Sequence, residues 1–228
     1  LEYSSYTHQD TTDSKSRFSI AKPDSSHFKL LHLATGKTYN FPRGNSFYLK
    51  SPLFSVSYNT VEGNALNLLS AWKKEWKNGK YLKVSPMVRY ALGSNHLYGD
   101  VFTTYGAEKW NVIVSGGKTL NQFNSEFPIS NLANSIASRF FNQSLMKLYQ
   151  STYVKGEFSI KDIGDVFQFK TSLGIDNRKE VYNLENAKPI FIWDKFGFVP
   201  NKPINNEMGN TGFPTHLAFI WDVHAQVS

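Results

Sequence analysis

Apolar and polar residues alternate along most of the segment from Leu53 to Gly117. In residues 82–92, one face carries Leu82, Val84, Val88, Tyr90 and Leu92, and the other carries Lys83, Ser85, Met87, Arg89 and Ala91. Successive side chains of a strand point to opposite faces, so this period predicts β-strands rather than helices. Asn78-Gly79, between two such runs, supplies the two positive-φ residues of a tight hairpin turn. The segment is therefore predicted to form an antiparallel meander.

The same alternation predicts further strands along the chain. The expected strands are 27–34, 54–58, 66–72, 82–92, 97–105, 110–115, 154–160, 167–175 and 217–223. Residues 1–26 are predicted to be a polar lead-in and 35–44 a loop. Gly63-Asn64 leaves open whether the chain bends or breaks into two strands there. We therefore expect a polar lead-in with one short strand in residues 1–52, and one β unit of about seven or eight strands in residues 53–228.

A change of period after residue 128 predicts one amphipathic helix from Asn131 to about Tyr149, with a break near Asn142 left open. Its apolar residues recur at three- and four-residue spacing: Ile129, Leu132, Ala133, Ile136, Ala137, Phe140 and Phe141. Ser130 is available as its N-cap. Two long connections follow, at 176–188 and 194–214, and connections of this length are usually functional or mobile.

Composition narrows the class of protein. Of the 228 residues, 40% are apolar and 15% are aromatic, so a disordered chain is not expected. The absence of cysteine excludes a disulfide scaffold, a thiolate nucleophile and a cysteine-ligated metal. No run of about 18 apolar residues predicts a transmembrane helix, although strands can cross a membrane without one.

The net charge of +7 and a pI near 9.4 predict an anionic partner. The densest basic group, between Lys73 and Lys83, surrounds a hairpin tip beside Trp72 and Trp76. No nucleic-acid recognition motif accompanies it, so we expect no nucleic-acid partner. A turn that faces solvent or lipid headgroups explains these lysines better.

Alternation alone fits both a soluble β-sandwich and a transmembrane β-barrel. Several predicted strands approach the ~9–11 residues that cross a bilayer at a tilt. Trp and Tyr lie mostly near strand ends, as in an interfacial girdle. The apolar faces are uncharged, and the charges fall on the opposite faces: Lys83, Arg89, Asp100, Lys155, Glu157, Lys170 and Asp222. These features favour the barrel, whereas Pro86 inside a strand implies a bulge or an edge there.

Several short motifs occur in one order: Tyr58 to Gly63, Ser85-Pro86 with Arg89-Tyr90, Ser115 to Gly117, Gln122 to Asn124 with Pro128 to Ser130, and Lys147 to Tyr149. Through them, residues 50–225 resemble large Bacteroidota outer-membrane proteins described as carboxypeptidase-regulatory-like domain-containing, whose C-terminal part is a domain of unknown function. The resemblance implies a β-barrel segment and no peptidase activity. In that family a β-sandwich precedes this segment and further strands follow it, so the chain is expected to be an internal fragment.

No catalytic or metal-binding motif is visible. The HExxH and G-x-S-x-G patterns are absent, and the spacing of His27 and His32 suits metal ligands poorly. We therefore expect no enzyme, no metal and no cofactor. Glu62 and Arg89 are candidate lumen or rim residues, because each lies in a resembling motif and each would be costly against lipid. A contact between them is expected, and a structural ion pair or two separately solvated groups remain the alternatives to a transport role.

The sequence thus predicts a mainly β fold: an antiparallel meander forming part of a transmembrane β-barrel, with a helix inserted near 131–149. We expect a non-enzymatic role in envelope assembly or transport in the bacterial outer membrane. The expected partners are membrane lipid, anionic headgroups and other outer-membrane proteins. The alternatives are a secreted β-sandwich that binds glycan or another anionic polymer through Trp193, Phe196 and Phe198, and a hydrolase on the long loops. Because eight strands barely close a barrel, we expect an open, curved sheet completed by later strands.

Overall fold

The computed structural model describes residues 31–52, 55–124, 127–163, 167–185, 187, 198–202 and 215–227. In chain order the elements are α1 (Leu31–Thr35), β1 (Lys37–Phe41), the 3-10 turn η1 (Pro42–Gly44), β2 (Asn45–Leu49), β3 (Val56–Asn59), β4 (Gly63–Glu75), β5 (Tyr81–Ala91), β6 (His96–Gly106), β7 (Trp110–Gln122), α2 (Asn131–Phe140), β8 (Leu148–Ile163), β9 (Phe167–Glu180) and β10 (His216–Val227). The predicted fold class, a mainly β antiparallel meander with an inserted helix, is confirmed.

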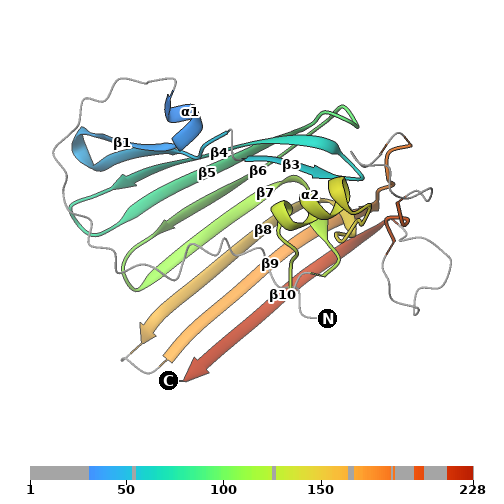
Figure 1. Cartoon of the computed structure of the whole chain (residues 1–228). Helices are drawn as coiled ribbons and strands as arrows, with labels where there is room; N and C mark the ends of the chain where they lie inside the picture. Colours follow the sequence, from blue (N-terminus) through green and yellow to red (C-terminus); the bar gives the residue numbers. More distant parts are fainter. Residues whose placement is uncertain are drawn as a thin grey trace.

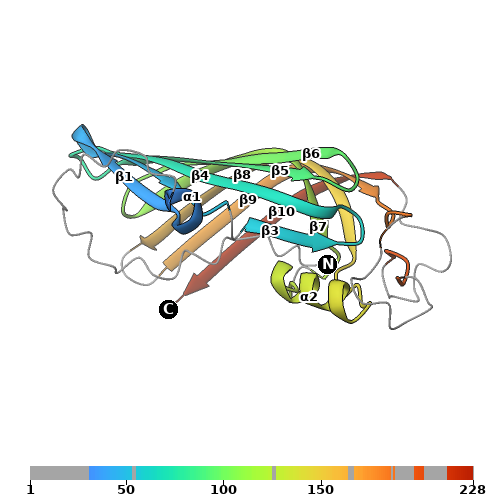
Figure 2. The same ribbon diagram turned by 45° about the horizontal axis from the view of Figure 1, so that its top comes forward.

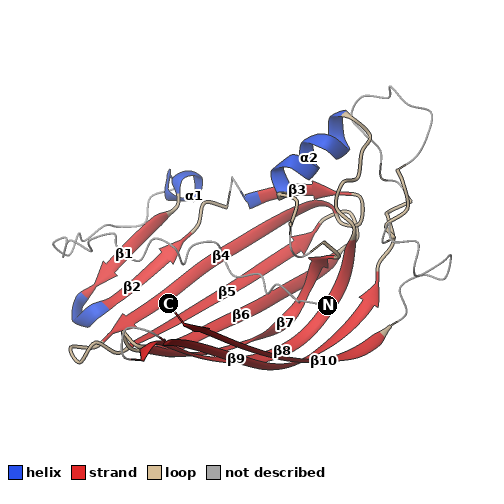
Figure 3. Cartoon of the chain, turned by 90° about the horizontal axis from the view of Figure 1, so that it is seen from below, coloured by secondary structure: helices blue, strands red, loops and turns tan. Residues whose placement is uncertain are grey.

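All ten described strands belong to one antiparallel sheet in the order β1-β2-β4-β5-β6-β7-β8-β9-β10. β3 pairs with the first half of β4, and β2 pairs with its second half. The sheet is one curved layer, with α1 near β1 and α2 near β3 (Figures 2 and 3). β1 and β10 form its two outer edges and do not pair with each other. The expectation of an open, curved sheet is therefore confirmed for the described residues.

Strand register divides the side chains of β4 to β10 between two faces. Large apolar side chains lie exposed on one of them, called here the apolar face: Leu66, Leu68, Val88, Tyr90, Val101, Tyr105, Val114, Val154, Phe158, Leu173, Ile175, Phe219, Trp221 and Val223. The charged and hydroxyl side chains of the other face, the polar face, are crowded together, and Ser151, Ser172 and Asp176 are buried there. Crowding on one face and exposure on the other indicate that the polar face is the concave one.

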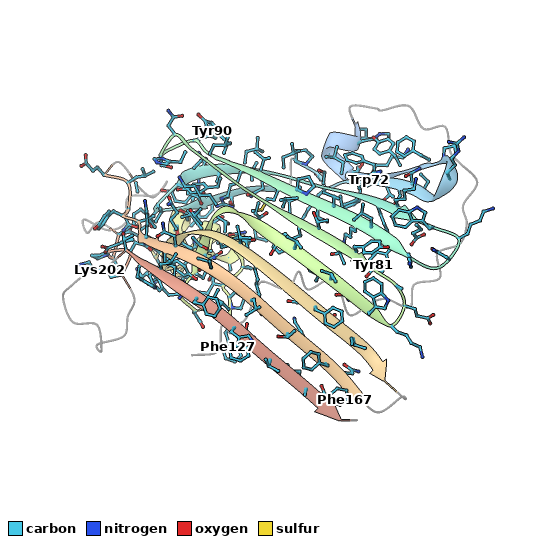
Figure 4. The ribbon with its side chains drawn as sticks, turned by 180° about the vertical axis from the view of Figure 1, so that it is seen from behind. Trp72, Tyr81, Tyr90, Phe127, Phe167 and Lys202 are labelled. Atoms are coloured by element: carbon cyan, nitrogen blue, oxygen red, sulfur yellow. The ribbon has the colours of Figure 1, made fainter. Side chains whose placement is uncertain are left out.

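The two ends of the sheet carry different connections (Figure 1). At one end, β4 joins β5 through residues 76–80, and β6 joins β7 through 107–109. At the other end lie the turn 92–95, the described part of residues 123–147, which contains α2, and residues 181–185 and 198–202. We call these the short-turn end and the long-connection end. Figure 4 shows Trp72, Tyr81 and Phe167 toward the first and Tyr90 and Lys202 toward the second.

The prediction of a strand at 27–34 is wrong for residues 31–34, because residues 31–35 form the helix α1. Tertiary contacts hold this short helix: His32 Nδ1 lies 2.8 Å from the Tyr39 hydroxyl, and the Ser51 hydroxyl donates to the Ala34 carbonyl at 2.6 Å. Gly36, with φ +69°, follows the helix. Residues 27–30 lie outside the described residues.

The prediction of a loop at 35–44 is also wrong, because these residues contain β1 and the turn into β2. Tyr39 pairs with Phe47, and their rings lie 6.4 Å apart. Arg43 and Gly44 adopt positive φ and turn the chain between the two strands. The glycine and proline that suggested a loop thus mark a hairpin turn.

Two other elements, the helix and β7, end at different residues from those expected. The helix stops at Phe140 instead of Tyr149, because Asn142 adopts a φ of +54° and the chain then enters β8. β7 continues to Gln122 instead of ending at Ser115. A Cβ at Gly117 would lie 2.3 Å from the Gly99 carbonyl oxygen, so a glycine is needed for this close approach between strands.

The remaining differences concern turns and connections. The chain breaks before Gly63 (φ +69°) into β3 and β4, which settles the question left open there. Residues 176–180 belong to β9 rather than to a loop. Pro86 is in the interior strand β5, where the pairing with β4 is interrupted between Met87 and Val84. The proline lacks an N–H donor, so it interrupts the ladder without forming an edge. Within the described residues, none of the helices is both long enough and apolar enough to cross a membrane.

Candidate functional site: a buried polar cluster at the long-connection end

Asn59 organises the turn between β3 and β4. Its side-chain oxygen accepts hydrogen bonds from the backbone N–H groups of Val61, at 3.0 Å, and Glu62, at 2.8 Å. Its side-chain amide donates to Glu62 Oε2 at 2.5 Å. An asparagine can cap a turn in this way because its short side chain reaches the backbone two and three residues further on. The turn thereby fixes the carboxylate of Glu62.

Arg89 of β5 completes a bidentate ion pair with Glu62. Arg89 Nε donates to Glu62 Oε1 at 2.6 Å, and Nη2 donates to Oε2. The Glu62 side chain is 0% exposed and that of Arg89 is 11% exposed. Planar, two-point pairing of guanidinium with carboxylate is strong and geometrically specific.

Asn67 of β4 holds the other side of the guanidinium. Its side-chain oxygen accepts from Arg89 Nη1 at 2.9 Å, and its amide donates to the Ser55 carbonyl at 2.7 Å. Each charged group therefore has several partners, which offsets the cost of burying it. The expected contact between Glu62 and Arg89 is present, whereas a binding or gating role for the two residues stays a prediction.

The turn of Glu62 is tied to the long connections. The Thr60 hydroxyl donates to the Asn183 side-chain oxygen at 2.6 Å and lies 3.1 Å from the Ser144 hydroxyl. The Leu184 N–H donates to the Thr60 carbonyl at 2.8 Å. The connections before β8 and after β9 therefore meet at the β3–β4 turn.

A second point joins the same two connections. The Asn201 side chain exchanges hydrogen bonds with the backbone of Leu148, at 2.8 and 2.7 Å, and donates to the Val181 carbonyl at 2.7 Å. Lys147 Nζ donates to the Pro200 carbonyl at 2.9 Å. Burial lowers the pKa of the Lys147 ammonium from its ordinary value.

α2 covers the outer edge of β3. Ser130 is its N-cap, as predicted, and its hydroxyl accepts from the Ala133 N–H at 3.1 Å. Ser135 accepts from the Tyr58 N–H at 2.8 Å, and Asn134 donates to the Tyr58 carbonyl at 3.3 Å. An uncovered strand edge can pair with another chain, so these contacts protect β3.

The helix turns its polar side inward. Asn134 and Ser138 are buried, and Asn134 also accepts from the Met146 N–H at 3.0 Å. Ala137 is buried beside them, whereas the larger apolar residues of the helix, Leu132, Ile136 and Phe140, are exposed. A helix packed on a hydrophobic core would bury these larger residues.

Sequence reasoning missed a second buried ion pair, between Asp176 and Arg178 of β9. Asp176 accepts from Arg178 Nε at 2.8 Å and from the Ser151 hydroxyl at 2.5 Å. The Arg178 guanidinium also lies 5.6 Å from the ring centre of Tyr149. The two charges are two residues apart and so share a face of a strand, which is a signal the sequence offered.

Further charges on the polar face lie near one another. Lys170 Nζ lies 3.1 Å from Glu157, and Lys155 Nζ lies 3.9 Å from Asp222. The Ser172 hydroxyl donates to Asp222 at 3.0 Å. The polar face therefore carries charges of both signs, most of them paired. Asp100 is the exception, because its Oδ1 is buried without a hydrogen-bond partner.

The chemistry of these groups is that of a structural network. The carboxylates of Glu62 and Asp176 are both engaged by arginines, so neither is placed as a free general base. Among the described residues, no three His, Asp or Glu side chains gather closely enough to hold a metal ion. Of the aromatic residues considered for glycan binding, Trp193 and Phe196 lie outside the described residues and Phe198 is partly buried.

These features define a single-sheet β protein with an exposed apolar face and a closed polar cluster. The chain belongs to a family of unknown function, the DUF5686 C-terminal domain, which it matches over residues 31–228. No curated protein and no solved structure shows a significant match to it.

Proposed function

We propose that this chain forms part of the wall of a bacterial outer-membrane β-barrel, with its apolar face against lipid and its polar face toward the interior. Its role is non-enzymatic, in envelope assembly or transport. The partners are membrane lipid with its anionic headgroups, and other outer-membrane proteins, with no nucleic acid. The motifs that resemble Bacteroidota carboxypeptidase-regulatory-like domain-containing proteins support the same assignment.

The exposed apolar face is the observation that carries this proposal. Val154 is 65%, Leu173 53% and Phe219 71% exposed, and each belongs to a different strand of the same face. Large contiguous apolar patches are rare on soluble monomers and mark contact with a partner or a membrane. Alternation of lipid-facing apolar and interior polar residues is the pattern of a transmembrane barrel.

Strand length supports the proposal independently. β4 and β7 have 13 residues each, β8 has 16 and β9 has 14. Soluble strands average ~5–6 residues, whereas ~9–11 cross a bilayer at a tilt. Strands of this length reach across the hydrocarbon layer and extend beyond it.

A soluble β-sandwich has less support. A sandwich buries its apolar residues between two facing sheets. The described residues form one sheet, and its apolar face has no second sheet against it. We therefore retain the barrel wall as the function that the geometry supports best.

Fractionation of the full-length protein from its own cells tests the proposal. The protein should sediment with outer membranes, resist extraction by alkaline carbonate and enter solution only with detergent. A soluble periplasmic protein and a known outer-membrane porin serve as controls. Recovery in a soluble fraction without detergent would overturn the proposal.

A further inference from the structure

We infer that the short-turn end of the sheet faces the inner, phospholipid leaflet, where its lysines contact anionic headgroup phosphates, and that α2 and the long connections lie on the outer side. This inference rests on the proposed function and adds the orientation of the chain and the lipid that it contacts. Three observations carry it: the connections, the aromatic rings and the lysines.

The connections differ in size between the two ends. Residues 76–80 and 107–109 close the short-turn end. The other end carries the short turn 92–95, but also α2 and the described residues 181–185 and 198–202 (Figure 1). Outer-membrane barrels have short periplasmic turns and longer extracellular loops. Described residues of the two long connections are also bound to each other, because Asn201 contacts Leu148 and Val181 and Thr60 contacts both Asn183 and Ser144.

Aromatic rings gather at the short-turn end. The ring of Trp76 lies 6.2 Å from that of Tyr105, and the ring of Tyr105 lies 5.7 Å from that of Trp110. All three residues are at or next to strand ends. Rings with an apolar body and a polar edge favour the level of the headgroups, so this cluster marks a membrane interface.

Lysines also lie at this end of the sheet, two of them beside aromatic rings. Lys74 Nζ lies 6.0 Å from the ring centre of Trp76, and Lys73 Nζ lies 5.6 Å from that of Tyr81. Lys77, Lys80 and Lys109 are exposed in the adjoining turns. Cationic side chains are attracted to an anionic membrane surface. The short-turn end carries several lysines beside its aromatic rings. The partner with matching chemistry is the phosphate of a phospholipid headgroup.

Single-cysteine labelling tests the orientation, because this chain contains no cysteine of its own. Glu108→Cys places a thiol in an exposed short turn, and Gln143→Cys places one at an exposed position after α2. A membrane-impermeant maleimide should label Gln143→Cys in intact cells and Glu108→Cys only after the outer membrane is permeabilised. Both variants, solubilised in detergent, should label equally as a control.

The outcomes separate the two proposals. Labelling of Glu108→Cys in intact cells, or of Gln143→Cys only after permeabilisation, overturns the orientation while the protein still needs detergent for extraction. Release of the protein without detergent overturns the proposed function instead.

Matched lysine variants test the headgroup contact. The full-length protein is refolded into phosphatidylcholine vesicles with or without phosphatidylglycerol, and the inserted fraction is measured. Lys77→Gln/Lys80→Gln should lower the advantage given by phosphatidylglycerol, by about fivefold per lysine. Lys179→Gln/Lys202→Gln, at the other end, should leave it unchanged. Equal effects of the two double variants, or none from either, would overturn the contact.

Discussion

The two faces of the sheet reverse the usual relation between polarity and burial. On the apolar face, Leu173 and Val154 are largely exposed, whereas on the polar face Asp176 and Ser172 are buried. Soluble proteins bury apolar side chains and pair the few charges that they bury. The polar side chains thus find most of their partners within the sheet, whereas the described residues leave the apolar face uncovered.

The two faces also contribute to the stability of the sheet in different ways. On the polar face, Glu62 has both carboxylate oxygens engaged by Arg89, and Asn67 holds the opposite side of the guanidinium. These contacts remain whatever surrounds the sheet. The contribution of the apolar face depends on whether lipid covers it, because an exposed apolar side chain gains nothing in water. Mutations on the two faces should therefore respond differently to membrane insertion.

The largest effect should follow Glu62→Ala. Removing the carboxylate leaves the buried Arg89 charge unpaired, so the free energy of unfolding should fall by about 3–5 kcal/mol. Denaturant unfolding in vesicles measures it, with Glu157→Ala on the more exposed pair with Lys170 as the matched control. An effect no larger than that of the control would contradict the account of the cluster.

A double-mutant cycle sharpens the same point. The Glu62→Ala/Arg89→Ala variant should cost less than the sum of the two single variants, because neither charge is then buried alone. Strictly additive costs would show that the two side chains are not energetically coupled.

A charge on the apolar face should have the next largest effect. Leu173→Arg should destabilise the inserted protein by about 2–4 kcal/mol, as for an arginine facing the middle of a bilayer. His224→Arg, at an exposed site on the other face of the neighbouring strand β10, should be close to neutral. Unfolding in vesicles measures both, and equal costs for the two would argue that Leu173 faces water.

A smaller effect is expected at the helix that covers β3. Ser130→Ala removes the hydroxyl that accepts the Ala133 N–H and should cost about 1 kcal/mol. Ser130→Asp should restore the lost stability, because aspartate caps a helix equally well. Failure of Ser130→Asp to do so would show that Ser130 contributes by other means.

The smallest effect should come from the exposed ion pair at the short-turn end. Glu75 lies 2.5 Å from Lys73, but both side chains contact solvent. Glu75→Gln should change the free energy of unfolding by less than about 1 kcal/mol. A larger loss, measured in the same assay, would show that burial is not what distinguishes this pair from Glu62 and Arg89.

The alternating pattern predicted the central strands because one face of each is mostly apolar and carries no charge within the expected segment. It missed β1 and β2 because Pro42 and Gly44 suggested a loop, although they form the turn of a hairpin. It also ended β9 before Asp176, since residues 176–180 contain no apolar residue to continue the alternation. A strand whose end is polar on both faces gives no signal of period two.

The candidate site was only partly predictable. Glu62 and Arg89 were singled out by motif and by the cost of placing a charge in lipid, and the structure brings them together. The roles of Asn59, Asn67 and Asn201 depend on strand register and on contacts between distant connections. The sequence could not supply these because hydrogen-bond partners are set by the tertiary fold.

The most direct test of the account asks what surrounds Leu173. A nitroxide spin label is attached to the full-length protein through a single cysteine, placed by Leu173→Cys, and its collisions with oxygen and with a water-soluble nickel chelate are measured in membranes. His224→Cys, on the polar face, serves as the comparison. The account predicts that oxygen collides with the label at Leu173 more than nickel does, since oxygen concentrates in hydrocarbon. Greater access for nickel than for oxygen at Leu173 would place the apolar face in water and contradict the account.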